Sequence, residues 1–345
     1  MATMQDVARR AGVSLSTVSY AINQTRPISP ATRERIEAAM AELGYRRNAM
    51  ARSLASRRSR TLALVLPASE NPLGGTLSEI STLAAREARA RDYHLTIWPG
   101  LGSEHDDAGQ LRDLAKQGLA DGAIFLEVSL DDVRVAAVEE VGFPAVLIGR
   151  PERTEGRFCV DIDFDVTVDR AVAHLAELGH RRIGFINHSE ASFERRYGPT
   201  VRSLAAYERA MAALGEPSNH EFSHESADGG RRAVERMLAR DPGLTAVILM
   251  NELAGFGLVA AALRSGLRLP EDLSVLGIVT SPGIGALVEP RLTTLAVPVA
   301  ELARTAVATL IDHLESEQEP GAPVLVACGL VPGASTAPPS KERPA

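Results

Sequence analysis

Short apolar runs alternate with amphipathic segments over most of the chain. Seven runs have the length and composition of buried parallel strands: 61–67, 94–98, 122–128, 144–149, 182–187, 245–251 and 273–279. Between them, apolar residues recur at helical spacing near 76–91, 131–141, 166–178, 199–214, 229–240 and 254–265. This alternation predicts a doubly wound parallel α/β sheet, and the length suggests two of them.

The first residues follow a purely helical pattern instead. Thr3, with Asp6 three positions later, is typical of a helix N-terminus, and the periodic run that follows stops at Gly12. Ser14 is expected to cap a second helix, in which one face carries Val18, Ala21 and Ile22. Two helices joined by so tight a glycine turn predict a helix-turn-helix.

A third helix completes this small unit. Ser29 is its expected cap, Pro30 its first residue and Gly44 its end, with an apolar stripe of Ile36, Ala39, Met40 and Leu43. Residues 1–60 carry eleven arginines against four acidic residues, so this segment has a charge of +7, while the chain as a whole carries −7. The remainder is therefore −14. A basic head on an acidic body suits a protein that binds nucleic acid, although a solvated basic face remains the alternative.

In a helix-turn-helix, the N-terminal side chains of the second helix contact base edges in the major groove. We expect Leu15, Ser16 and Tyr20 to do so here. Groups that hold phosphates and set the register are expected at Thr3, Ser14, Thr17, Asn23 and Arg33. Plain helix caps are the alternative reading of Ser14, Thr17 and Asn23.

These residues carry a resemblance to a known family. The segments TMQDVARRAGVSLSTVSYAIN and ATRERIEAAMAELGYRRNAMARSLASRRS resemble the DNA-binding head and hinge of the lactose-repressor (LacI) family of bacterial transcription regulators. Similarity continues in HLAELGHRRIGFI at 174–186, DLSVLGI at 272–278, PRLTTLAVPVAELARTA at 290–306 and the ST at 335–336. The resemblance implies a dimeric, ligand-controlled repressor that binds operator DNA, with a periplasmic-binding-protein-like core.

The stretch from Asn48 to Ala55 resembles the hinge helix of that family. Eight residues are too few to hold a helix alone in water, so we expect this segment to order when two copies pack together on DNA. By resemblance, Leu54 is a wedge in the minor groove. Further contacts to DNA in this segment are expected from Asn48, Ala51, Arg52, Arg57 and Arg58. A short linker with a tucked leucine is the alternative.

The resemblance also implies a division of the chain, with three crossovers near 159–162, 289–292 and 318–322. The expected parts are a helix-turn-helix domain (1–47), hinge helix and linker (48–60), N-terminal effector subdomain (61–159 plus 292–318), C-terminal effector subdomain (160–290 plus 322–336) and flexible tail (337–345). One helix-turn-helix contacts only a half-site, so a twofold dimer is expected. The tail APPSKERPA lacks the leucine heptad of a tetramerising helix.

Ligands of such folds bind beyond the carboxyl ends of the strands, in the cleft between the halves. Strand ends and the resemblance together predict an effector site of Ser69, Asn71, Leu73, Glu127, Arg150, Arg202, Asn251, Glu252 and Val279. Family sugar sites typically have Asp at the positions of Glu252 and Val279. Valine cannot bind a hydroxyl, which favours a less hydroxylated ligand, with a carbohydrate or derivative as the leading class. Internal capping or pairing is the alternative for Asn251 and Arg202.

Three other motifs in the sequence resemble metal or cofactor sites. Residues 220–224 satisfy H-E-x-x-H, but nearby Pro217 and Gly229 leave too little room for the helix that zinc binding requires. Residues 255–260 imitate a dinucleotide-binding fingerprint, but helix packing is the simpler explanation. Residues 161–165 begin like a calcium loop, yet Val166 and Val172 replace its glycine and glutamate. His180 is expected beside the last carbonyls of a helix.

Composition narrows the class of protein. Apolar residues make up 45% and charged residues 23% of 345, as in globular proteins, and no uncharged apolar run is long enough for a membrane span. The N-terminus lacks a signal-peptide pattern, so the expected location is the cytoplasm. Cys159 and Cys328 form no paired motif, and no nucleophile–base pair or cofactor site was found. The alternative to a regulator is a binding module or enzyme whose basic head is only an adaptor.

Overall fold

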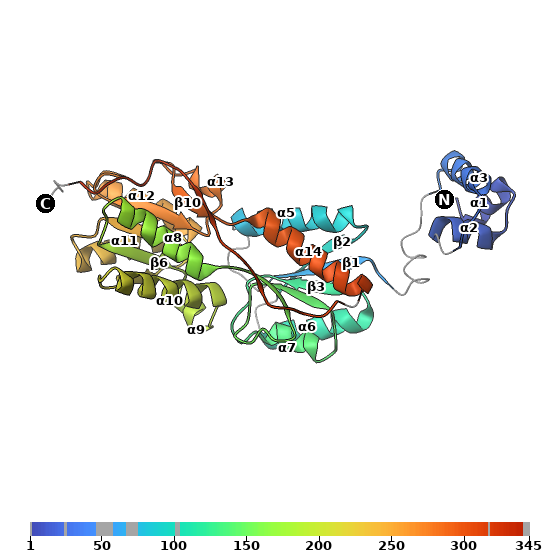
Figure 1. The fold of residues 1–345 in the computed structure, drawn as a ribbon, viewed down its shortest axis with the longest axis horizontal. Coiled ribbons are helices and arrows are strands. Elements are labelled where there is room, and N and C mark those ends of the chain that lie inside the picture. The colour runs from blue at the N-terminus through green and yellow to red at the C-terminus, as the bar shows by residue number, and fades with distance from the viewer. Residues whose placement is uncertain are drawn as a thin grey trace. The chain divides into compact units, whose positions relative to one another are not determined.

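The computed structural model describes residues 2–23, 26–45, 58–66, 75–100, 104–316 and 318–340. The chain forms two compact units, Met1–Ser59 and Arg60–Ala345, which are described separately (Figure 1). Within the described ranges, no helix combines the length and apolar character needed to cross a bilayer.

The first unit contains helices α1 (Met4–Ala11), α2 (Leu15–Asn23) and α3 (Pro30–Glu42). The Thr3 hydroxyl accepts a hydrogen bond from the Asp6 amide at 3.3 Å, and Asp6 accepts one from the Thr3 amide at 2.9 Å, which confirms the predicted cap. Ser14 accepts a hydrogen bond from the Thr17 amide at 3.1 Å, and Ser29 one from the Thr32 amide at 3.3 Å. The three helices share a small core of Val7, Ala8, Ala11, Val18, Ala21, Ile22, Ile36 and Ala39.

The second unit contains two sheets of six strands. The first sheet has the order β11-β5-β4-β3-β1-β2, with every neighbouring pair parallel. Its strands are β1 (Thr61–Leu66), β2 (His94–Pro99), β3 (Gly122–Phe125), β4 (Ala145–Ile148), β5 (Phe158–Ile162) and β11 (Val324–Val326). Helices α5 (Gly75–Ala90) and α14 (Val299–Ser316) cover one face, and α6 (Glu104–Gln117) and α7 (Val133–Glu139) the other (Figure 1).

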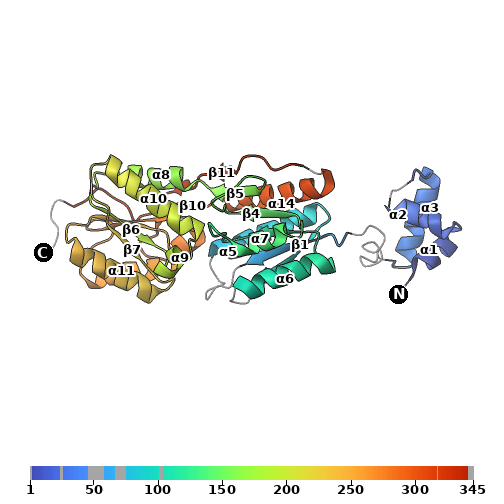
Figure 2. The ribbon, with the colours of Figure 1, turned by 90° about the horizontal axis from the view of Figure 1, so that it is seen from below.

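The second sheet has the order β12-β10-β9-β8-β6-β7 and is parallel except for β12, which runs antiparallel to β10. Its strands are β6 (Ile183–Asn187), β7 (His220–Phe222), β8 (Ala246–Leu249), β9 (Ser274–Ile278), β10 (Thr293–Ala296) and β12 (Gly329–Val331). Helices α8 (Phe164–Glu177) and α10 (Gly198–Ala213) pack together, as do α11 (Ala227–Arg240) and α12 (Glu252–Arg264) on the opposite face. Figure 2 shows α8 and α10 on one side of this sheet and α11 on the other. The short helices are α9 (Glu190–Glu194) and α13 (Pro282–Gly285).

The chain passes three times between the two sheets. Strand pairing places each of these crossings at a higher residue number than the sequence predicted. β5 runs to Ile162 inside the first sheet, so the chain crosses at 163 and the expected boundary at 159/160 divides a strand. β10 pairs with β9, so 292–296 belongs to the second sheet and the crossing is at 297–298. β11 pairs with β5, so 322–326 belongs to the first sheet and the last crossing is at 327–328. These strands are short, and some carry exposed or charged residues that the sequence pattern does not distinguish from loops.

The alternative motifs take structural positions. The H-E-x-x-H segment begins on strand β7. It is not helical there, which agrees with the prediction that this segment has no room for a helix. Gly257 lies in α12, where an added Cβ would sit 1.6 Å from the Ala227 carbonyl oxygen, so this glycine serves close packing of α12 against α11. His180 differs from its prediction: its fully buried ring bonds the hydroxyls of Thr245 and Ser274 and the Ala337 carbonyl, not the end of its own helix.

Candidate functional sites

The N-terminus of α2 presents an exposed apolar and hydroxyl surface. Leu15 is 48% exposed although it begins a helix whose other face is buried. The Ser14 hydroxyl lies 2.8 Å from the hydroxyls of both Ser16 and Thr17. Ser14 thus caps the N-terminus of α2, and its hydroxyl group lies between those of Ser16 and Thr17. This group of hydroxyls is at the positive end of the helix dipole, where phosphate oxygens bind favourably.

Other side chains brace this surface. Arg35 donates hydrogen bonds to the carbonyls of Ala11, at 2.5 Å, and Gly12, at 3.2 Å, and so fixes the turn that sets α1 against α2. The guanidinium of Arg26 lies 5.0 Å from the centre of the Tyr20 ring, which orients the tyrosine expected to meet DNA. Arg33 is partly exposed on the first turn of α3.

Some predicted site residues cannot be placed. The side chain of Asn23 and the residues Asn48, Ala51, Arg52, Leu54 and Arg57 lie outside the described part of the chain. The same holds for three predicted effector contacts, Ser69, Asn71 and Leu73.

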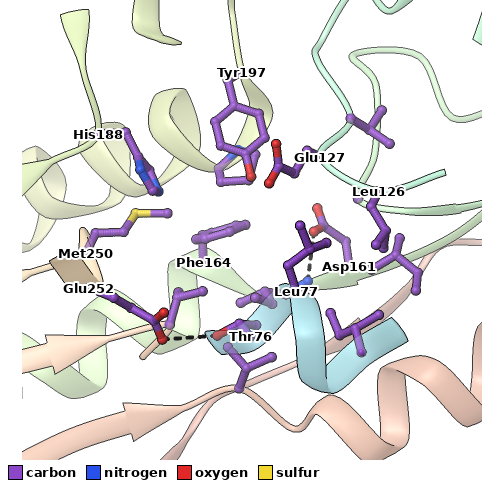
Figure 3. Close-up of a pocket in the computed structure, with 18 of the residues that line it drawn as sticks. Thr76, Leu77, Leu126, Glu127, Asp161, Phe164, His188, Tyr197, Met250 and Glu252 are labelled. Carbon is purple, nitrogen blue, oxygen red and sulfur yellow. Dashed lines mark hydrogen bonds between the residues drawn. The ribbon is translucent and has the colours of Figure 1, made fainter. Parts of the chain in front are cut away.

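The second unit holds a cavity of about 190 Å³ lined by residues from both sheets and their helices. Figure 3 shows Tyr197 and Glu127 facing the space from above, Phe164 within it and Glu252 beside Thr76 below. Its apolar wall includes Leu77, Ile80, Leu126, Ile148, Ile162, Phe164, Met250, Val279, Val297 and Leu302. The polar lining is Thr76, Glu127, Asp161, His188, Tyr197, Glu225, Asn251 and Glu252. Such an apolar space with few convergent polar groups is typical of a small-molecule site.

Four predicted effector residues, Glu127, Asn251, Glu252 and Val279, line this cavity. The other two in the described chain are not among its lining residues, because they hold a buried carboxylate. Arg150 donates a hydrogen bond to Asp161 at 3.1 Å, and a terminal nitrogen of Arg202 lies 3.9 Å from the same carboxylate oxygen. Both arginines therefore lie against Asp161, which does line the cavity.

Asn251 and Glu252 begin helix α12 at the carboxyl end of β8. The Asn251 side chain accepts a hydrogen bond from the Ala254 amide at 3.2 Å and donates one to the Ser223 carbonyl at 3.0 Å, so its amide is engaged internally. Glu252 accepts hydrogen bonds from the Thr76 hydroxyl at 3.1 Å and the Ser281 amide at 2.5 Å. Because Thr76 lies on α5, the Thr76–Glu252 bond joins the two halves across the cavity.

Two lining residues have a backbone conformation that side chains rarely adopt. Glu127 has φ of 53° and Val279 has φ of 54°. A positive φ is costly for a residue other than glycine, and most of all for a β-branched valine. Each residue follows the end of a buried strand, so the strain aims side chains into the space between the sheets.

Burial governs the titration of the acids here. Burial raises the pKa of Asp161 to about 6, against the opposing effect of Arg202 and Arg150. Burial, and then the Glu225 carboxylate, raise the pKa of Glu127. A hydrogen bond from His188, 3.0 Å away, lowers the pKa of Glu225. Burial, followed by Glu127 and Glu225, raises the pKa of Tyr197 well above its ordinary value, so its hydroxyl stays protonated.

The sequence analysis missed several lining residues, chiefly Thr76, Asp161, His188, Tyr197 and Glu225. Asp161 lies near the carboxyl end of β5, which was not recognised as a strand. His188 directly follows β6, whose run at 182–187 was predicted, so the strand-end rule alone could have found this residue. Glu225 follows β7 after a short loop, and Tyr197 precedes α10. Thr76 lies on a helix, where strand ends give no signal.

In the described ranges, no three histidine, cysteine or acidic side chains are grouped so as to hold a metal ion. Cys159 and Cys328 are buried free thiols, and burial raises the pKa of each to about 11, which keeps them unreactive.

Comparisons with known proteins match each of the two units to a known family. Residues 3–48 match the family "Bacterial regulatory proteins, lacI family", and residues 172–336 match the "Periplasmic binding protein-like domain". HTH-type transcriptional regulator CelR of Thermobifida fusca is 32% identical over 330 residues, which cover 91% of this chain and 92% of CelR. Catabolite control protein A of Priestia megaterium is 28% identical over 323 residues, 91% of this chain and 93% of that protein.

Solved structures agree over the whole length. A lac repressor dimer bound to operator and the anti-inducer ONPF is similar with a TM-score of 0.81 and 25% identity, covering 97% of this chain and 99% of the repressor chain. A transcriptional regulator CelR–cellobiose complex has a TM-score of 0.72 and 28% identity, covering 97% and 100%. The chain therefore belongs to the lacI family of bacterial regulatory proteins and is a DNA-binding transcriptional regulator.

Proposed function

We propose that this regulator is a repressor that binds a near-palindromic operator as a twofold dimer and responds to a small molecule in the cavity between its two sheets. The observation that carries the first part is the exposed N-terminus of α2, with Leu15 and Ser16 outward and Arg35 fixing the turn behind them. Such a helix fits the major groove. The proposed site of action is the cytoplasm, where a bacterial chromosome lies.

Each exposed residue has a proposed role. Leu15 packs on a thymine methyl group, and the Ser16 hydroxyl bonds a base edge. Ser14 and Thr17 bind a phosphate at the helix N-terminus, and Thr3, Asn23 and Arg33 hold neighbouring phosphates. Tyr20 reaches a base or phosphate beside Arg26. Leu54 and the residues around it are proposed to open the minor groove between the half-sites.

Dimerisation follows from the size of the first unit. One three-helix unit reaches only one half-site, so a symmetrical operator requires two chains. The related lac repressor was solved as a dimer on its operator. The proposed division into head, hinge and two effector subdomains follows the sequence analysis, with the crossings at 163, 297–298 and 327–328.

A ligand in the cavity touches both sheets at once. It therefore stabilises one spacing of the two halves over another, and an equilibrium between forms that bind the operator well or poorly shifts with it. The Thr76–Glu252 hydrogen bond is one contact that a ligand would strengthen or replace. The CelR–cellobiose structure supports a carbohydrate derivative as the class to test first.

A gel-shift assay on the DNA upstream of the coding sequence tests the proposal. The wild-type chain should give a retarded band that weakens as salt rises, because phosphate contacts release counterions. Ser16→Ala should weaken the specific band by about 5–150-fold, the effect of one lost base contact of about 1–3 kcal/mol. Ser78→Ala, an exposed serine of α5, is the matched control and should bind like wild type.

Equal retention of operator and random competitor DNA by the wild-type chain would contradict the proposal. So would a Ser16→Ala band as strong as the wild-type band.

A further inference from the structure

The polar lining of the cavity is strongly one-sided in charge. Four carboxylates, those of Glu127, Asp161, Glu225 and Glu252, line it, whereas no lysine or arginine is among the described residues that do so. His188 is the single basic side chain of that lining. An enclosed, largely apolar space strengthens the field of such charges.

Three of the four carboxylates already have partners. Asp161 is bound by Arg150 and approached by Arg202. Glu225 bonds His188 at 3.0 Å, and Glu252 bonds the Thr76 hydroxyl and a backbone amide. Each of these three carboxylates therefore accepts hydrogen bonds from groups of the protein itself.

Glu127 differs from these three. Within the described chain, its side chain has no hydrogen bond or ion pair. The neighbouring Arg134 donates to the Glu127 backbone carbonyl at 3.0 Å and forms its ion pair with Asp132 at 2.7 Å, so it acts on the Glu127 carboxylate only through space. In Figure 3 this carboxylate points into the cavity beside Tyr197. A largely buried carboxylate without an ion-pair partner is unfavourable, and burial accordingly raises the pKa of Glu127.

Aromatic rings stand around the same end. Tyr197 and His188 meet edge to face with ring centres 5.8 Å apart, and the buried Phe164 lines the space beside them. A carboxylate flanked by aromatic faces is a favourable environment for an organic cation, since the rings attract it through their quadrupoles. The rest of the wall is apolar, and Val279 offers nothing to a hydroxyl group.

We infer that the effector is a small organic ammonium ion whose charged nitrogen pairs with Glu127 beside Tyr197, while its less polar body contacts the apolar wall around Phe164 and Val279. The inference rests on the proposed role of the cavity as the effector site. A volume of about 190 Å³ lies below the roughly 300–1,000 Å³ of sites for drug-sized ligands, which favours a small molecule. A neutral polyol would leave Glu127 without its counter-charge.

Binding should depend on pH in one direction. Only the ionised Glu127 pairs with an ammonium group, so affinity should fall as pH drops through its raised pKa. The charged groups that face Glu127 are Glu225, His188, Arg134 and Arg195. In Glu127→Gln this fall in affinity should be lost, which would assign it to the Glu127 carboxylate.

Calorimetric titration of the full-length protein tests the inference with two pairs of probes. One pair is 2-phenylethylamine and 2-phenylethanol, and the other is glucosamine and glucose, so apolar and hydroxylated bodies are both represented. In at least one pair, the amine should bind at least about tenfold tighter than its neutral partner, as a charge-assisted hydrogen bond predicts. A preference for the amine in the first pair supports the whole inference. A preference in the second pair alone supports the pairing with Glu127 but contradicts the less polar body.

Variants assign the preference to Glu127. Glu127→Gln should reduce it to about threefold or less, and Glu127→Asp, which keeps the charge, should retain it. Glu208→Gln, an exposed acid on α10, is the control and should behave like wild type. Thermal melting of each variant checks that it is folded.

Equal or tighter binding of the neutral partners, no binding of either amine, or an unchanged preference in folded Glu127→Gln would overturn the inference. Gel shifts with and without the amine keep it separate from the proposed function. If the protein retards its operator but binds no amine, only the inference fails. If it binds amines but no operator, the proposed function fails.

Discussion

Substitution of Gly257 tests whether the glycine-rich start of α12 serves helix packing or nucleotide binding. An alanine Cβ at this position would lie 1.6 Å from the carbonyl oxygen of Ala227 on α11 and 2.4 Å from its carbon. A backbone carbonyl cannot rotate away as a side chain can, so the helices must separate. A Cβ added to Gly230 on α11 would likewise lie 1.8 Å from the carbonyl oxygen of Ala254, so the two helices are in close contact at both glycines.

The magnitude follows from two opposing terms. Overpacking of this severity costs about 3 kcal/mol, while alanine is favoured over glycine in a helix by about 1 kcal/mol. The net loss of unfolding free energy is therefore about 2 kcal/mol, or a melting temperature lower by about 4–8 °C for a unit of this size. Gly109→Ala on α6 is the matched control: nothing lies within 4 Å of its Cβ, so it should stabilise the protein by about 0.5–1 kcal/mol.

Differential scanning calorimetry of both variants measures the difference. A Gly257→Ala protein that melts at or above the wild-type temperature would refute the packing argument. Addition of NAD to the wild-type protein checks the other reading. Stabilisation by NAD that Gly257→Ala abolishes would restore the dinucleotide fingerprint as a function.

Three further predictions concern other parts of the chain. The pKa of Asp161 is raised from 3.8 to about 6, so ionisation of this carboxyl costs about 3 kcal/mol of unfolding free energy, which is lost as pH rises between these two values. In Asp161→Asn, the unfolding free energy measured in urea should therefore depend less on pH over that interval. A pH dependence equal to that of wild type would contradict this. Ser335 accepts a hydrogen bond from the buried Thr293 amide at 2.8 Å, so Ser335→Ala should cost about 1–3 kcal/mol in urea unfolding, whereas the exposed Ser78→Ala should cost nothing measurable; equal stability of the two would refute this. Leu54→Ala should weaken the operator band in a gel shift while leaving the melting temperature unchanged, and an undiminished band would exclude the wedge.

The three-helix head was predictable because its signals are local. Thr3, Ser14 and Ser29 each bond an amide two or three residues into the helix they precede, so a few adjacent letters determine where each helix begins. The buried positions Val18, Ala21 and Ile22 follow from helical spacing alone. The contact of Arg35 with the turn was not predicted, since it joins residues 23 and 24 positions apart.

The two sheets were predicted, but strands β5, β7, β10, β11 and β12 were not among the predicted runs. Central strands such as β8, Ala246–Leu249, are buried throughout and stand out as apolar runs. β11 and β12 have three residues each and are partly exposed, so nothing local marks them as strands or assigns them to different sheets. β5 was overlooked because Asp161 interrupts its apolar run, although Arg150 and Arg202 offset that charge.

The candidate cavity was predictable where strand ends supply its lining. Glu127, Asn251, Glu252 and Val279 follow strands and do line it. Whether a polar residue is free to meet a ligand depends on partners far away in sequence. Asn251 is engaged by the Ser223 carbonyl and Glu252 by Thr76, 176 positions away, and no pattern in the sequence reveals either contact.

The late return of the chain to its first sheet has a consequence for synthesis on the ribosome. β5 ends at Ile162, but the covering helix α14 is complete only at Ser316, 316 − 162 = 154 residues later. Because the ribosome adds roughly 5–20 residues per second, the apolar face that α14 covers stays exposed for about 8–30 s before α14 has been synthesised. The nascent first sheet therefore cannot mature independently, and a chaperone that shields this face during translation should raise the yield of native protein.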